Sequence, residues 1–289
     1  MFKKKKDQTY QSYWSISWNI FKKNKVAMVC LFIVILLCLI ALFAPLIAPY
    51  DPNKQVPTDR LMKPCGQHWF GTDDLGRDIF SRIIYGCRVS LSVGIISQII
   101  ATVIGYTMGV CAGYFGGKVD SVISFLIQVF SSFPFLLFAM AIMFVLGPGL
   151  INLYLALGLL GWASTARLIR GDVMRLKKME YIDACKVSGG NSFRIIMKHL
   201  LPNCLSTLIV TVTLGIPNAI MSEASLSFLG LGVKAPMASW GSMISFSQPY
   251  IRSATYYSVI PGLAIIITVL AFNMLGDGLR DALDPKLRS

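Results

Sequence analysis

The sequence predicts an all-α membrane protein that crosses the bilayer six times. Of its 289 residues, 55% are hydrophobic and only 14% are charged, and the mean hydropathy is +0.63. Soluble domains carry about 25% charged residues. Apolar runs of roughly 20 residues, long enough to cross a bilayer, recur along the chain. These runs are continuous, whereas the strands of a membrane barrel alternate apolar and polar residues, so helices are expected.

Each apolar run is taken as one span, and the expected ranges are 26–48, 89–112, 122–146, 150–168, 205–222 and 257–276. The fourth run is the least apolar, because small and polar residues interrupt it. The first follows a basic start, but its apolar stretch is too long for a signal peptide, so we expect it to be retained. Spans three, five and six contain prolines that are expected to kink them: Pro134, Pro217 and Pro261.

The placement of the 27 Lys and Arg residues predicts the topology. Six spans put both termini on one side, and most basic residues fall in the termini and in the loop between spans four and five. The positive-inside rule makes that side cytoplasmic. We therefore expect a cytoplasmic tail at 1–25, a first span at 26–48, an external loop at 49–87, a five-helix core at 88–277 and a cytoplasmic tail at 278–289. The same rule accounts for the net charge of +13 without a nucleic-acid partner.

The external loop carries a helix signal of its own. Thr72 precedes two acids and is expected to cap a helix. Apolar residues then recur every four positions, at Leu75, Ile79, Ile83 and Cys87. Charged residues are expected on the opposite face, at Arg77, Asp78 and Arg82. This pattern predicts an amphipathic helix along the outer membrane surface, either as a packing element or with a further role of its own.

Span two carries a stripe of small residues. Ala101, Gly105 and Gly109 lie four residues apart, and the spacing continues from Ser97 to Gly113. Such a stripe lets another helix approach closely in lipid. The neighbour is either another helix of this chain or a partner subunit.

Catalytic, nucleotide and metal chemistry are not indicated, and no cofactor is expected. The seven cysteines form no Cys-x-x-Cys pair, and His68 and His199 are expected on opposite sides of the membrane, so metal ligands do not converge. Pairing of Cys65 with Cys87 is left open. The turn 116–119 lacks the glycine and hydroxyl residue of a phosphate loop. The spans carry almost no ionisable residue, which disfavours a self-powered carrier or pump.

The polar segment at about 171–203 predicts a helical hairpin. A first short helix is expected from Met179 to Ser188, and Gly189 can adopt the left-handed turn that ends it. Asn191 can cap a second helix, and Pro202 marks the entry to span five. The hairpin either docks in a groove of a soluble partner or is an ordinary solvated loop.

The hairpin carries a family resemblance. Asp183-Ala184-Cys185, Gly189 and Leu201-Pro202 have the spacing of the Glu-Ala-Ala-x3-Gly-x9-Ile-x-Leu-Pro motif, so the chain resembles ABC importer permeases. Three positions depart from that motif: Asp183, Cys185 and His199. Longer matches are similar to the C-type permease subunit of dipeptide, oligopeptide and nickel importers, and they lie at His68–Asp78, Ser90–Gly94, Glu223–Gly232 and Asp277–Pro285.

The resemblance implies a type I, MetI-like permease core in a bacterial plasma membrane. It implies a second, B-type permease subunit, two ABC ATPase subunits that hydrolyse ATP below the membrane, and an external solute-binding protein. The loop that couples this chain to the ATPases would comprise Glu180, Asp183, Ala184, Cys185, Gly189, Leu201 and Pro202.

The implied substrate is a di- or oligopeptide, with nickel or a metal chelate as the alternative. A stand-alone channel or secondary carrier, and a scaffold that moves nothing, are the competing classes. Binding of an ATPase partner would separate the importer from both of them.

Overall fold

The structure is a computed structural model that describes residues 13–284, and within this range it is helical, with a single isolated bridge between Thr72 and Asp78. The first half of the chain forms α1 (Tyr13–Lys23), α2 (Lys25–Leu42), α3 (Ala44–Ile47), η1 (Pro57–Asp59), α4 (Ile79–Phe115), α5 (Gly117–Ser132) and α6 (Phe135–Leu146). The second half forms α7 (Leu150–Leu176), α8 (Glu180–Val187), α9 (Ser192–Ile195), η2 (Ile196–Leu200), α10 (Leu201–Phe228), α11 (Trp240–Ser247), η3 (Gln248–Tyr250) and α12 (Thr255–Leu283).

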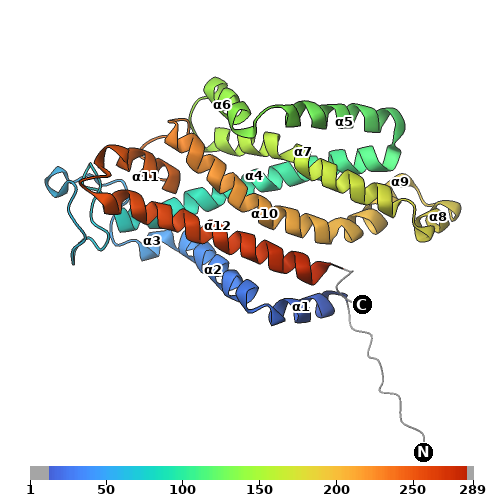
Figure 1. The fold of residues 1–289 in the computed structure, drawn as a ribbon, viewed down its shortest axis with the longest axis horizontal. Coiled ribbons are helices and arrows are strands. Elements are labelled where there is room, and N and C mark those ends of the chain that lie inside the picture. Colours follow the sequence, from blue (N-terminus) through green and yellow to red (C-terminus); the bar gives the residue numbers. More distant parts are fainter. Residues whose placement is uncertain (1–12, 285–289) are drawn as a thin grey trace, which may run out of the picture.

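Four long helices, α4, α7, α10 and α12, run along the long axis of the molecule (Figure 1). α2 packs against α12 and α4, while α5 and α6 pack against α7. The connection with α8 and α9 lies at one end of the bundle, and the segment between α3 and α4 lies at the other (Figure 1). The two polar segments that the sequence singled out are therefore separated by the length of the helices.

The six expected spans are not all recovered as separate crossing helices. Among the described residues, four units are long and apolar enough to cross a membrane: α2, α4, the continuous stretch Ser192–Phe228 and α12. The range 122–146 is broken into α5 and α6, which are bent by 90° and together would supply a fifth crossing. The break falls at Phe133–Pro134, because proline lacks an N–H and disfavours a helical residue before it.

The range expected for span four, 150–168, lies within α7, which continues to Leu176 and is not among those units. Polar and small residues within its apolar run lower its hydropathy: Asn152, Gly158, Gly161 and Ser164. Pro217 and Pro261 lie inside α10 and α12, and both helices continue past them.

The prediction of a separate amphipathic helix that begins at Thr72 is wrong. α4 starts at Ile79 and runs without interruption through the range expected for span two. Its N-cap is Asp78, whose carboxylate accepts a hydrogen bond from the Ser81 amide at 2.7 Å. Gly76 has a φ of 71°, and a side chain there would collide with the backbone of Val56, so residues 71–78 form a turn.

The charges expected on an exposed face, Arg77, Asp78 and Arg82, are buried. Asp73 accepts from Arg77 Nε at 2.6 Å and lies 3.4 Å from Arg82 Nε. Arg82 also donates from Nη1 to the Pro52 carbonyl at 2.9 Å. We call residues 49–78 the outer cap, after the side of the membrane on which the charge pattern of the sequence predicts them. The sequence pattern is the same whether the charged face of a helix meets solvent or is covered by a loop. Here the outer cap covers the charged face at the start of α4.

A second buried polar cluster joins three helices near the cap. The carboxylate of Glu223 in α10 accepts from Ser227 at 2.6 Å and from Ser90 of α4 at 3.5 Å. Ser90 in turn accepts from the Trp240 amide, at the start of α11, at 3.3 Å. Because Glu223 is completely buried, these hydroxyls replace the water it lost, and they tie α4, α10 and α11 together.

Candidate functional site

The segment 177–203, which we call the hairpin, is built from short helical pieces. α8 is followed by Gly189 with a φ of 78°, in the left-handed region that glycine adopts without strain. The carboxamide of Asn191 accepts from the Arg194 amide at 2.8 Å and so caps α9. The π-helical turn η2 then leads directly into α10, with Pro202 in its first turn. The hairpin is thus continuous with a long helix of the bundle.

The base of the hairpin is anchored in the bundle. Ile182, the one buried residue of α8, joins Ile195 and Leu200 in an apolar cluster with residues of α4 and α7. Lys177 donates from Nζ to the Tyr114 carbonyl at the end of α4 at 2.5 Å. Sequence analysis missed Ile182, although an isoleucine between Glu180 and Asp183 was the available signal. The base of the hairpin is therefore packed against the ends of α4 and α7.

Residues expected to form the coupling loop surround this anchor. Glu180, Asp183, Ala184, Gly189 and Pro202 are exposed, while Cys185 and Leu201 are half-buried. Asp183 forms a 2.8 Å ion pair with Lys186 one turn away, with 64% of its side chain exposed.

The interior side of the hairpin is more tightly packed. Cys185 Sγ lies 3.6 Å from His199 Nε2, and a side chain at Gly190 would come within 2.7 Å of Cys185. Partial burial, with a smaller contribution from Cys204, raises the pKa of Tyr181, which accepts a hydrogen bond from Asn203 at 3.5 Å. Two of the three departures from the family motif, Cys185 and His199, therefore lie against each other.

The tip of the hairpin carries apolar side chains that sequence analysis did not single out. Val187 is 90% exposed and Phe193 is 72% exposed, on either side of the Gly189 turn. Met197 is also exposed. An aromatic and an aliphatic side chain held in water at the end of an anchored hairpin form a surface suited to contact with another protein.

The small-residue stripe of α4 lies against α7. A side chain at Gly105 would come within 2.6 Å of Thr165, and one at Gly109 within 2.7 Å of the Ala166 carbonyl. Ala101 faces Gly161, where an added Cβ would lie 3.0 Å from the Ala101 methyl. The neighbour of the stripe is thus a helix of this chain, and the two backbones approach closely.

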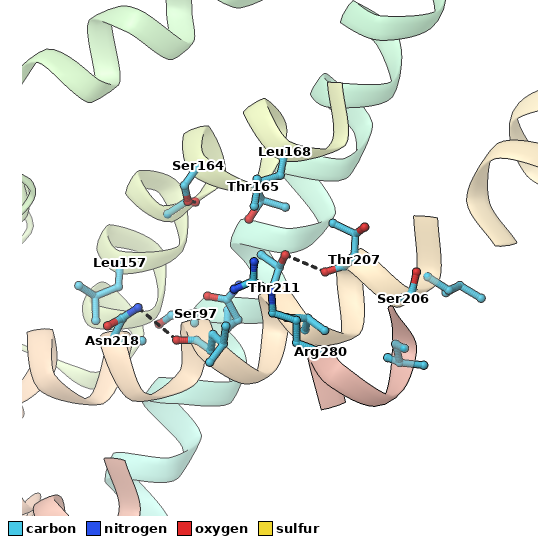
Figure 2. Close-up of a pocket in the computed structure, with 18 of the residues that line it drawn as sticks. Ser97, Leu157, Ser164, Thr165, Leu168, Ser206, Thr207, Thr211, Asn218 and Arg280 are labelled. Atoms are coloured by element: carbon cyan, nitrogen blue, oxygen red, sulfur yellow. Dashed lines mark hydrogen bonds between the residues drawn. The ribbon is translucent and has the colours of Figure 1, made fainter. Parts of the chain in front are cut away.

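A cavity of about 1330 Å³ opens between α4, α7, α10 and the end of α12. Figure 2 shows Ser164, Thr165 and Leu168 on α7 facing Thr207 and Thr211 on α10. The ionisable lining residues among those described are Arg175, Arg280 and Asp284, at the hairpin end. Sequence analysis predicted no cavity, although it named two of its lining residues, Ser97 and Pro202, for other reasons. The available signal was a row of small and polar residues at helical spacing on α10: Asn203, Thr207, Thr211, Gly215, Asn218 and Ser222.

The remaining candidates are placed as follows. Cys65 is exposed in the outer cap, and Cys87 is buried in α4, where its thiol donates to the Leu37 carbonyl at 3.5 Å. The two cysteines do not form a disulfide with each other. No group of three or more metal-ligating side chains converges among residues 13–284.

Two family models match the chain. The binding-protein-dependent transport system inner membrane component model matches residues 102–289, and the model for the N-terminal transmembrane domain of oligopeptide transport permease C matches residues 12–64.

Curated relatives match over most of their length. The chain is 46% identical to the dipeptide transport system permease protein DppC of Bacillus subtilis, over 96% of this chain and 87% of that protein. It is 42% identical to the oligopeptide permease OppC of the same species, over 96% and 91%. It is 41% identical to the glutathione permease GsiD of Pectobacterium atrosepticum, over 98% and 95%.

Solved structures share the fold. A chain of the methionine ABC transporter MetNI, described in inward-facing conformations, has a TM-score of 0.58 and 19% identity, covering 71% of this chain and 98% of that one. At this identity the likeness shows the fold, which is the MetI-like permease fold expected from the sequence.

Proposed function

The chain belongs to the family of binding-protein-dependent transport system inner membrane components, and on that premise we propose that it forms half of the membrane passage of a peptide importer. It is an ABC permease subunit, as its relatives are. The substrate class is proposed from those relatives, which are named for dipeptides, oligopeptides and glutathione. The substrates in those names share amide bonds between amino acids.

The observation that carries the proposal is the connection between hairpin and cavity. The hairpin is anchored to α4 and α7 through Ile182, and it continues directly into α10. These three helices line the cavity. A partner that binds the exposed tip can therefore shift the helices that line the cavity without contacting the substrate.

The other functions of the importer belong to the proposed partner subunits. Two ATPase subunits hydrolyse ATP and receive the hairpins of this chain and of a B-type permease, and an external binding protein delivers the substrate. ATP and substrate bias the passage only through different affinities for its inward-open and outward-open states. This chain carries no catalytic step.

The proposed orientation puts both termini and the hairpin in the cytoplasm and the outer cap outside, as the positive-inside rule predicts. In a variant without native cysteines, Lys63→Cys in the outer cap should react with an impermeant maleimide added to intact cells. Ser192→Cys in the hairpin should react only after the membrane is opened. Labelling of position 192 in intact cells would show that the orientation is the opposite of the one proposed.

Gly189→Val tests the coupling role. A β-branched residue at a φ of 78° costs about 1–2 kcal/mol in backbone strain, so the turn should rearrange. We expect ATP-driven peptide uptake in vesicles to be lost, while membrane insertion and capture by the binding protein are kept. Asp183→Lys should act in the same direction but less severely.

Gly171→Val is the matched control, because Gly171 is exposed, lies inside α7 and has open space around it. It should retain most of the uptake. Wild-type uptake by Gly189→Val at equal protein level would show that the hairpin does not couple ATPase and passage.

A further inference from the structure

Two consecutive residues of α4 present unused hydrogen-bonding groups to the cavity. Ser97 is 2% exposed, lines the cavity, and its hydroxyl has no partner among the described residues. Gln98 is 8% exposed, and its carboxamide nitrogen donates to Thr102 at 3.3 Å. Its oxygen accepts no hydrogen bond from the part of the chain that the structure describes. Buried polar groups normally have partners, so these two require an explanation.

The neighbouring helix leaves room for Gln98. Gly215 of α10 lies against its carboxamide, and a side chain at position 215 would collide with Oε1, Cδ and Nε2. Gly215 itself lines the cavity. The carboxamide is thus held between α4 and α10 at the cavity wall, and a glycine permits that position.

The surroundings of Ser97 and Gln98 are polar but uncharged. Asn218 of α10 also lines the cavity, and its carboxamide nitrogen donates to the Leu214 carbonyl at 3.1 Å. Figure 2 shows Ser97 and Asn218 together at one end of the cavity, away from Arg280. The charged lining residues, Arg175, Arg280 and Asp284, belong to the hairpin end.

We propose that Ser97, Gln98 and Asn218 form a subsite that hydrogen-bonds the main-chain amides of a peptide in transit. A carboxamide offers a donor and an acceptor side by side, as a peptide group does, so the two can pair. Because the subsite is neutral, it recognises the main chain and accepts both cationic and anionic side chains. This subsite rests on the proposed peptide import and specifies what the passage recognises.

The test uses the reconstituted importer, with both permeases, the ATPases and the binding protein, in proteoliposomes. The probes are three labelled tripeptides: trialanine and its analogues with central lysine or central aspartate. Gln98→Leu removes the hydrogen-bonding groups at similar volume. We expect it to lower uptake of all three peptides by the same factor, about five- to ten-fold, with Ser97→Ala lowering it about two- to three-fold.

Gln98→Glu sharpens the test, since it introduces a negative charge at an otherwise neutral position. The uptake ratio of the lysine peptide to the aspartate peptide should rise at least about three-fold. Ile99→Leu, one residue along α4 at an exposed position, is the control and should transport as the wild type does.

The outcomes separate the two proposals. Peptide uptake by the wild type together with unchanged uptake by Gln98→Leu overturns the subsite alone. A loss confined to one of the three peptides also overturns it, because main-chain recognition affects all equally. If the wild-type importer takes up none of the peptides while its ATPase is active, peptide import itself fails, and the subsite with it. Co-purification of the ATPases with each variant excludes misfolding as the cause of a loss.

Discussion

The outer cap and the hairpin are polar connections at opposite ends of the same helices. They differ in whether their charged side chains are buried or exposed. In the cap, Asp73 and Arg77 are buried, and Asp73 pairs with Arg77 and with the buried Arg82 of α4. In the hairpin, Asp183 and Lys186 pair on an exposed face, and Val187 and Phe193 project into water. The cap is completed within the chain, whereas the hairpin leaves its tip uncovered.

The difference separates stability from coupling. A buried ion pair that loses one member leaves an uncompensated charge, so changes in the cap should unfold the protein. An exposed ion pair contributes little, so changes at the hairpin tip should leave the fold intact and affect only what binds there. The two regions can therefore be compared variant by variant, in order of the expected effect on stability.

The largest effect is expected for Asp73→Asn. It removes the negative charge that faces Arg77 at 2.6 Å and Arg82 at 3.4 Å, both buried. The free energy of unfolding should fall by about 3–5 kcal/mol, measured from thermal unfolding of the purified protein in detergent. Asp183→Asn, at a side chain that is 64% exposed, should change it by less than about 1 kcal/mol. Equal losses from the two variants would remove the distinction between the regions.

An intermediate effect is expected for Ile182→Ala at the base of the hairpin. The change empties a fully buried position between α4, α7 and α10, which costs about 2–4 kcal/mol where the surroundings cannot collapse. The loss should be local and should appear as faster hydrogen exchange of the α8 amides. Val187→Ala, at the exposed end of the same helix, should leave that exchange unchanged. Unchanged protection in Ile182→Ala would mean that the base is not anchored as described.

The smallest effect on stability is expected for Phe193→Ser, since its side chain is already in water. Its effect should fall on assembly instead, with ATPase co-purification lowered about five- to ten-fold if the aromatic ring is a main contact. Trp69→Ser, at an exposed aromatic residue of the outer cap, is the matched change at the other region. It should leave ATPase co-purification intact, and a loss there equal to that of Phe193→Ser would contradict the assignment of the two ends.

Several features of the fold were accessible from local sequence. The Gly189 turn, the Asn191 cap and the short helix at 180–187 lie where the residues predict them, because each depends on contacts within a few positions. Pro134 signalled a kink, but a 90° bend between α5 and α6 is set by what the two helices pack against. The helix start at Thr72 was wrong because Gly71 and Gly76, on either side of it, adopt turn conformations with positive φ. The backbone between these two glycines hydrogen-bonds to residues 56–62 instead of forming a helix.

By itself, the sequence determined the class of the protein, its family motif and the positions of most helices, since hydropathy, caps and turns act over short distances. Only the tertiary structure decided that Arg77 and Arg82 are buried, that Ile182 anchors the hairpin, and that Ser97 and Gln98 face a cavity. A periodic pattern shows that a helix has two faces. Which face meets a loop, another helix or a cavity depends on residues far away in the chain.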